Sequence, residues 1–102
     1  MKGTDKQIIW ATDIQANVIA SFEQFILDIQ SADVLEEIKA ANIAGCHERI
    51  VALNNAEYAG DIIDLFKDIR FTGNVGVDFP KVMAVYRVTK ANTPGEKEIL
   101  RR

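Results

Sequence analysis

Residues 44–69 hold the pattern that most restricts the fold, because a short apolar run is followed directly by an amphipathic one. Residues 49–53 (RIVAL) are rich in branched side chains and too few for a helix of their own, which favours a buried strand. At 100° per residue, five large apolar side chains of residues 55–69 share one helical face: Tyr58, Ile62, Leu65, Phe66 and Ile69. The stretch therefore predicts a strand followed by a helix.

The start of this helix is predicted at Asn54, whose side chain can accept a hydrogen bond from a free backbone N–H. With Asn54 as the N-cap, Glu57 falls at the third helical position and completes a capping box. Leu53 and Tyr58 then stand at the two ends of a hydrophobic staple. We therefore expect a helix over residues 55–69.

An acidic stripe lies opposite the apolar face of this expected helix and consists of Glu57, Asp61, Asp64 and Asp68. Like charges four residues apart cost roughly 0.2–0.5 kcal/mol per pair in an isolated helix. The stripe is typical of a solvated face, and the alternative is a surface that meets cations of another segment or subunit. No second acidic cluster or Glu-x-x-His pattern accompanies it, so neither a metal nor a cofactor is expected.

Cys46 and His47 are the only Cys and His of the chain and are the weak catalytic candidates. On a strand, neighbouring residues point to opposite faces, so these two cannot easily act on one substrate. A lone Cys among apolar residues is more often a buried small side chain than a nucleophile. A small-molecule site near Cys46 would draw on Tyr86 and Arg87, with Trp10 as a wall.

Length and composition favour one domain over residues 1–102, with flexible ends at 1–6 and 91–102. A hydrophobic content of 48% is ordinary for a globular protein. A single Cys allows no internal disulfide, which fits a reducing compartment. No apolar run reaches the ~20 residues of a membrane span, and residues 1–10 lack a signal-peptide pattern. A soluble cytoplasmic protein is expected.

Charge is unevenly placed along the chain. Residues 1–69 hold 12 acidic and five basic residues, a net charge of −7, whereas residues 70–102 carry +4. The basic end contributes Arg87, Lys90, Arg101 and Arg102, which could complement the acidic stripe of the same protein or of a second copy. No nucleic-acid-binding motif accompanies these residues, and nucleic acid is not an expected partner.

The other elements are predicted from periodicity and caps. Residues 7–11 suggest a strand or the lead-in to a helix over 13–30, which Thr12 and Gln15 would cap. The apolar face expected for this helix consists of Ile14, Val18, Phe22, Phe25, Ile26 and Ile29. A break at Ser31, as an N-cap, separates a second helix that Gly45 would stop. Residues 82–90 form the strongest strand pattern, and 75–79 an edge strand. Thr93, Pro94 and Glu96 indicate a terminal helix, with Ile99 and Leu100 as the residues that would dock it.

The expected fold is α/β (or α+β), with a three- or four-stranded mixed sheet and about three helices packed on it, in the order β-α-α-β-α-(β)-β-(α). An α-rich fold with only a C-terminal β-hairpin is the alternative. The expected function is a non-catalytic protein-interaction module that forms a homodimer or binds a basic protein. The alternative function is a small-molecule-binding protein or small enzyme with a site near Cys46 and His47.

Overall fold

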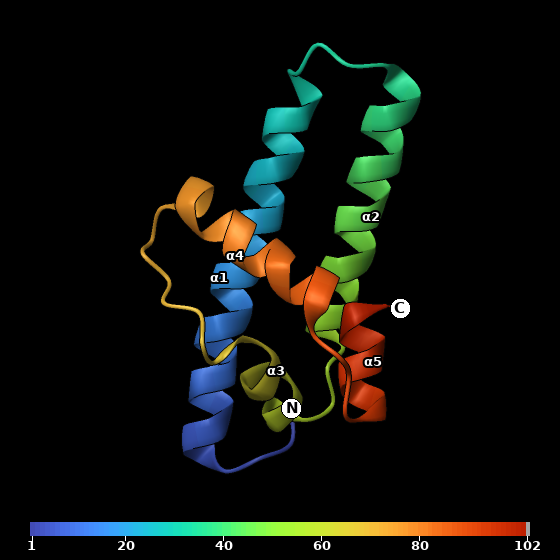
Figure 1. Cartoon of the computed structure of the whole chain (residues 1–102). Coiled ribbons are helices and arrows are strands. Elements are labelled where there is room, and N and C mark those ends of the chain that lie inside the picture. Colours follow the sequence, from blue (N-terminus) through green and yellow to red (C-terminus); the bar gives the residue numbers. More distant parts are fainter. Residues whose placement is uncertain (102) are drawn as a thin grey trace.

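The computed structural model describes residues 1–101 and is helical throughout (Figure 1). The helices are α1 (Asp5–Gln30), α2 (Glu36–Asn54), α3 (Ala59–Phe66), α4 (Val75–Val88) and α5 (Pro94–Leu100). Helices α1 and α2 run antiparallel as a long hairpin, and α4 crosses it on one side. Helix α3 packs near the start of α1, and α5 packs beside α2. The result is a helical bundle 45 Å long and 27 by 21 Å across.

The predicted α/β sheet is wrong, because no strand forms within residues 1–101. The extended pairing in this part of the chain is a single parallel bridge between Lys2 and Tyr58. Residues 7–11 and 49–53 lie inside α1 and α2, and α4 takes up 75–79 and most of 82–90. The alternative with a terminal β-hairpin is wrong for the same reason. Each apolar run is one part of a longer helix, and a short run alone does not distinguish a strand from a buried helical segment.

Helix α1 begins eight residues earlier than the 13–30 prediction. Its capping box joins Thr4 and Gln7: the Thr4 Oγ1 accepts from the Gln7 N–H, and the Gln7 side chain accepts from the Thr4 N–H. The predicted box at Thr12 is therefore wrong, and Gln15 instead donates a 2.7 Å hydrogen bond to the Leu53 carbonyl of α2. The break near Ser31 is confirmed, although Ser31 is the C-cap of α1 and not an N-cap.

Helix α2 continues past Gly45 to Asn54, so the predicted stop at Gly45 is wrong. Asn54 is the last residue of α2, and it is not the N-cap of a helix over 55–69. The next helix, α3, begins only after Tyr58 and ends at Phe66. A helical glycine costs only about 1 kcal/mol relative to alanine, and the burial of Cys46, Ala52 and Leu53 on the same helix outweighs that cost.

The core lies where α1, α3 and α4 meet, below the projecting end of the hairpin. Phe22 of α1 is fully buried and meets the ring of Tyr86 of α4 edge-on at 5.5 Å. Phe66 of α3 closes the cluster, with its ring 5.9 Å from that of Tyr86. Rings packed edge-on add about 0.5–1.5 kcal/mol per pair to the burial of apolar area. These contacts hold α4 across the hairpin.

The predicted terminal helix is confirmed. Thr93 accepts from the Glu96 N–H at 3.0 Å, Glu96 accepts from the Thr93 N–H, and Pro94 occupies the first turn of α5. Ile99 and Leu100 are buried, as predicted for the residues that dock this helix. Among the described residues, no helix is long and apolar enough to cross a membrane.

Candidate functional site

The residues of the acidic stripe do not form one uninterrupted helical face. Glu57 precedes α3 and pairs with Lys2 at 3.0 Å, and Asp68 follows α3 and is exposed. Asp64 is exposed and lies 4.0 Å from Lys67. Asp61 is buried. The proposed role of these four residues in binding stays a prediction, but the burial of Asp61 removes it from the surface, where the other three are exposed.

Asp61 joins α3 to α5. Its Oδ1 accepts a 2.8 Å hydrogen bond from the hydroxyl of Thr93, the N-cap of α5. The backbone of Gly95 approaches so closely that a Cβ there would overlap the Asp61 carboxylate. This carboxylate therefore anchors the terminal helix.

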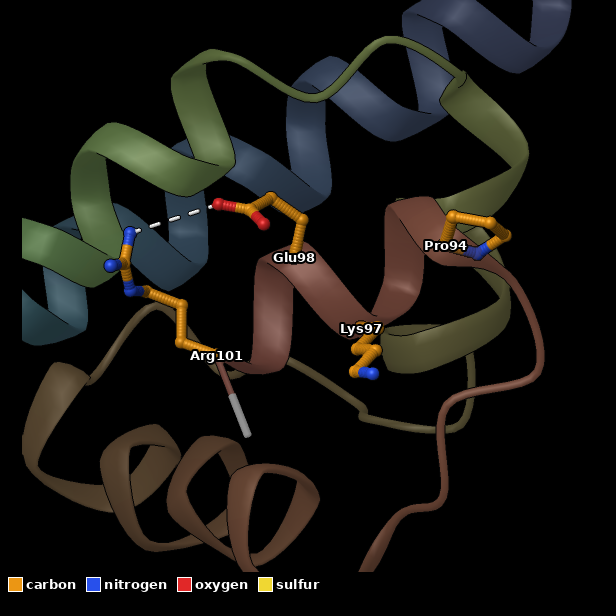
Figure 2. Close-up of a pocket in the computed structure, with 4 residues that line it drawn as sticks. All are labelled: Pro94, Lys97, Glu98 and Arg101. Carbon is orange, nitrogen blue, oxygen red and sulfur yellow. Dashed lines mark ion pairs between the residues drawn. The ribbon is translucent and has the colours of Figure 1, made fainter.

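The basic residues of the C-terminal end are spread over several surfaces. Arg101 lies 3.8 Å from Glu48 of α2 and 3.9 Å from Glu98 of α5, and Figure 2 shows its side chain reaching back toward Glu98. In the same view Lys97 points away from this pair, and both line one open pocket together with Pro94. Lys90 is exposed after α4. Arg102 lies outside the described residues.

Cys46 and His47 occupy different sides of α2. Cys46 is buried and lines a cavity beneath α4, whereas His47 is exposed on a groove formed by α1 and α2. Burial raises the pKa of the Cys46 thiol, and the positive charge of Arg49 offsets only part of that rise. The thiolate is the reactive form, so the environment of Cys46 disfavours nucleophilic attack at neutral pH. Both residues stay weak catalytic candidates, and the structure does not bring them to one site.

The cavity beside Cys46, here called the arginine pocket, measures about 310 Å³ and lies between α1, α2 and α4. It is lined by apolar walls, by Asn42 and by two guanidinium groups, those of Arg49 on α2 and Arg87 on α4. Arg87, a residue of the predicted Cys46 site, lines the same cavity as Cys46, and the binding role of both residues stays a prediction. Trp10 is half-exposed on α1 and does not line the pocket.

A second concave surface, here called the hairpin groove, is lined by α1 and α2 alone. Its volume is about 400 Å³, and its walls are Glu23, Ile26, Leu27, His47 and Ile50. Leu27 exposes 60% of its surface. The groove belongs to the side of the hairpin that α4 does not cover, since no residue of α4 lines it.

Sequence reasoning missed Arg49, Leu27 and Glu23 as members of these sites. Arg49 was assigned to a strand, and Leu27 fell outside the apolar face expected for residues 13–30. The position of Leu27 could have indicated this site, because a Leu on the polar side of a helix indicates a second contact surface on that helix.

No known protein family, no curated protein and no solved structure matches this chain.

Proposed function

We propose that this protein is an interaction module that self-associates through the hairpin groove, with a second copy of the chain as its partner. The observation that carries the proposal is the apolar surface left open on one face of the α1–α2 hairpin. Leu27 is largely exposed beside the partly buried Ile50, and Leu35 exposes 66% at the hairpin tip. Burying such side chains contributes about 1.5–3 kcal/mol each.

The helical hairpin is the kind of unit that a second hairpin completes. Two antiparallel helices have only one seam between them, and four-helix bundles enclose a core by pairing two such hairpins. In this protein α4 covers one face of the hairpin, and the hairpin groove lies on the opposite face of the hairpin. A second copy laid on that face would enclose Leu27 and Ile50 between four helices.

The polar rim of the groove favours a second copy over an unrelated partner. Glu23 stands on the α1 side and His47 on the α2 side. Twofold symmetry makes each contact occur twice, so Glu23 of one copy meeting His47 of the other also brings the reverse pair together. A carboxylate can accept from the imidazole N–H, and one surface thereby supplies both members of the pair.

The test is the solution mass of the full chain by light scattering, at about 50 mM and about 500 mM salt, which span weak and strong screening. We expect a dimer at both salt concentrations, because an apolar interface does not depend on exposed charges. Leu27→Glu should convert the dimer to a monomer, since it puts a charge on the apolar lining of the groove. Circular dichroism checks that the variant remains helical.

The matched control is Val88→Glu, which adds the same charge at a side chain that is 76% exposed on α4, outside the groove. It should leave the mass unchanged. A wild-type monomer at both salt concentrations would overturn the proposal. A dimer that dissociates at high salt would also overturn it, in favour of pairing between the acidic stripe and a basic surface.

The same proposal places the protein in the cytoplasm. Its single thiol, Cys46, is buried and free, which suits a reducing compartment where thiols persist.

A further inference from the structure

We infer that the arginine pocket binds a small organic anion, a carboxylate carried on an apolar body. The pocket volume of about 310 Å³ lies at the lower end of the range for small-molecule sites. This site is separate from the hairpin groove, because the two share no lining residue and open on opposite sides of the hairpin.

Arg49 is held in place by aromatic rings. Its guanidinium carbon lies 4.9 Å from the centre of the Tyr86 ring and 5.8 Å from that of Phe22. Its Nη1 donates to the Met83 sulfur at 3.8 Å, and sulfur is a weak acceptor. A guanidinium carries five N–H donors in a rigid fork, so a fixed Arg49 is a preformed receptor for a carboxylate.

Arg87, on α4, adds a second positive charge to the lining of the same pocket. None of the ion pairs formed within residues 1–101 includes Arg49 or Arg87. The described residues that line the pocket include no acidic side chain. Two like charges in one cavity repel each other, and an anion between them would relieve the repulsion while accepting charge-assisted hydrogen bonds from both.

The remaining walls define the body of the ligand. The rings of Phe25 and Phe79 stack nearly parallel, 7° apart with centres separated by 4.9 Å, and Met83 lies beside them. Aromatic and thioether surfaces favour an apolar group, whereas Asn42 offers one neutral polar contact at the rim. An arylacetate combines an apolar body with a carboxylate in a compact molecule. Its ring would contact the apolar walls, and its carboxylate would contact the two guanidinium groups.

The experiment is a titration of the full chain with phenylacetate. Binding is measured by calorimetry and, separately, by the chemical shifts of the backbone amides. We expect saturable binding with one molecule per chain and shifts centred on residues 41–49 and 79–87. Phenylacetamide has the same shape without the charge, and acetate has the charge without the ring. Both should bind at least about tenfold more weakly, as the loss of a charge-assisted hydrogen bond or of ring burial requires.

The variant Arg87→Gln removes one charge at an exposed side chain and should weaken phenylacetate binding about tenfold or more. Arg70→Gln is the matched control, because Arg70 is also exposed and does not line the pocket. Equal binding of phenylacetate and phenylacetamide would overturn the inference. So would equal effects of the two substitutions, or no saturable binding up to about 10 mM.

Discussion

Two buried carboxylates show how single residues fix the loops and the terminal helix of this bundle. Asp61 accepts from the Thr93 hydroxyl and secures α5, and Asp78 secures the turn before α4. Asp78 accepts from both the backbone N–H and the hydroxyl of Thr72, at 3.0 and 2.9 Å. Burial opposes its ionisation, but these hydrogen bonds outweigh that effect and hold the pKa of Asp78 below its ordinary value.

The lowered pKa of Asp78 predicts how stability depends on pH. An unfolded Asp titrates near pH 3.9, so the contribution of Asp78 is present above that pH and is lost as the pH falls through the lower folded value. Asp78→Asn should therefore destabilise the protein at neutral pH. It should also reduce the fall in unfolding free energy between about pH 5 and about pH 2.5. Urea denaturation across this range measures both effects.

The control for this prediction is Asp64→Asn, because Asp64 is exposed and its pairing with Lys67 is long, at 4.0 Å. It should reproduce the pH dependence of the wild type. If both variants show the same pH dependence, Asp78 does not carry the acid sensitivity.

Among single residues, the sequence predicted correctly those contacts that form between residues close together in the chain. The cap of α5 was predicted because Thr93, Pro94 and Glu96 form their contacts within a single turn. The burial of Asp61 was not predicted, because its partner Thr93 lies 32 residues away in the chain.

At the scale of the helices, two glycines have opposite roles. Gly45 lies within α2, and a Cβ there would meet nothing within 4 Å. Gly95 lies within α5, where a Cβ would overlap the Asp61 carboxylate. Helix propensity favours alanine at both positions, but space is available only at Gly45.

Gly45→Ala should stabilise the protein by roughly 0.5–1 kcal/mol, the propensity difference between the two residues in a helix interior. Gly95→Ala should destabilise it, because overpacking costs about 1–3 kcal/mol and exceeds a propensity gain of about 1 kcal/mol. The free energy of unfolding from chemical denaturation distinguishes the two. A destabilised Gly45→Ala variant would contradict a continuous α2, and an unaffected Gly95→Ala variant would contradict the close approach of Asp61.

The helices also show why the sheet prediction failed. Residues 82–88 alternate in a way that suits two covered strand faces, yet α4 buries Val82 and Tyr86, four residues apart, as a helix does. Because α4 crosses the hairpin and also meets α3, apolar side chains are required on more than one of its sides. Such a helix lacks a clear 3.6-residue pattern and resembles a buried strand in sequence.

At the scale of the whole molecule, the projecting end of the hairpin has fewer neighbours than the rest. Helices α3, α4 and α5 pack around the lower and middle parts of α1 and α2, and the tip stands beyond them (Figure 1). Val34, Leu35 and Ile38 are all exposed there. Apolar exposure at an unsupported end is consistent with the self-association proposed above.

Self-association predicts that thermal stability depends on protein concentration. A dimer is favoured by mass action, so the apparent Tm of the wild type should rise over about a hundredfold increase in concentration. The Leu27→Glu variant should show a constant Tm over the same range, and Val88→Glu should behave as the wild type. Calorimetric scans at matched concentrations provide the measurement. A wild-type Tm that does not change would argue against a dimer coupled to folding.

Local sequence patterns were sufficient to predict the helix that Thr93 begins, the break between the first two helices near Ser31, and the largely apolar face of residues 13–30. No local pattern showed that the short apolar runs are helical or that Arg49 and Arg87 line one pocket, because both depend on packing between distant segments. Intrinsic preferences for helix or strand differ by about 1 kcal/mol or less per ordinary residue. Burying one large apolar side chain contributes about 1.5–3 kcal/mol, so the packing of distant segments outweighs the local preference of a short run.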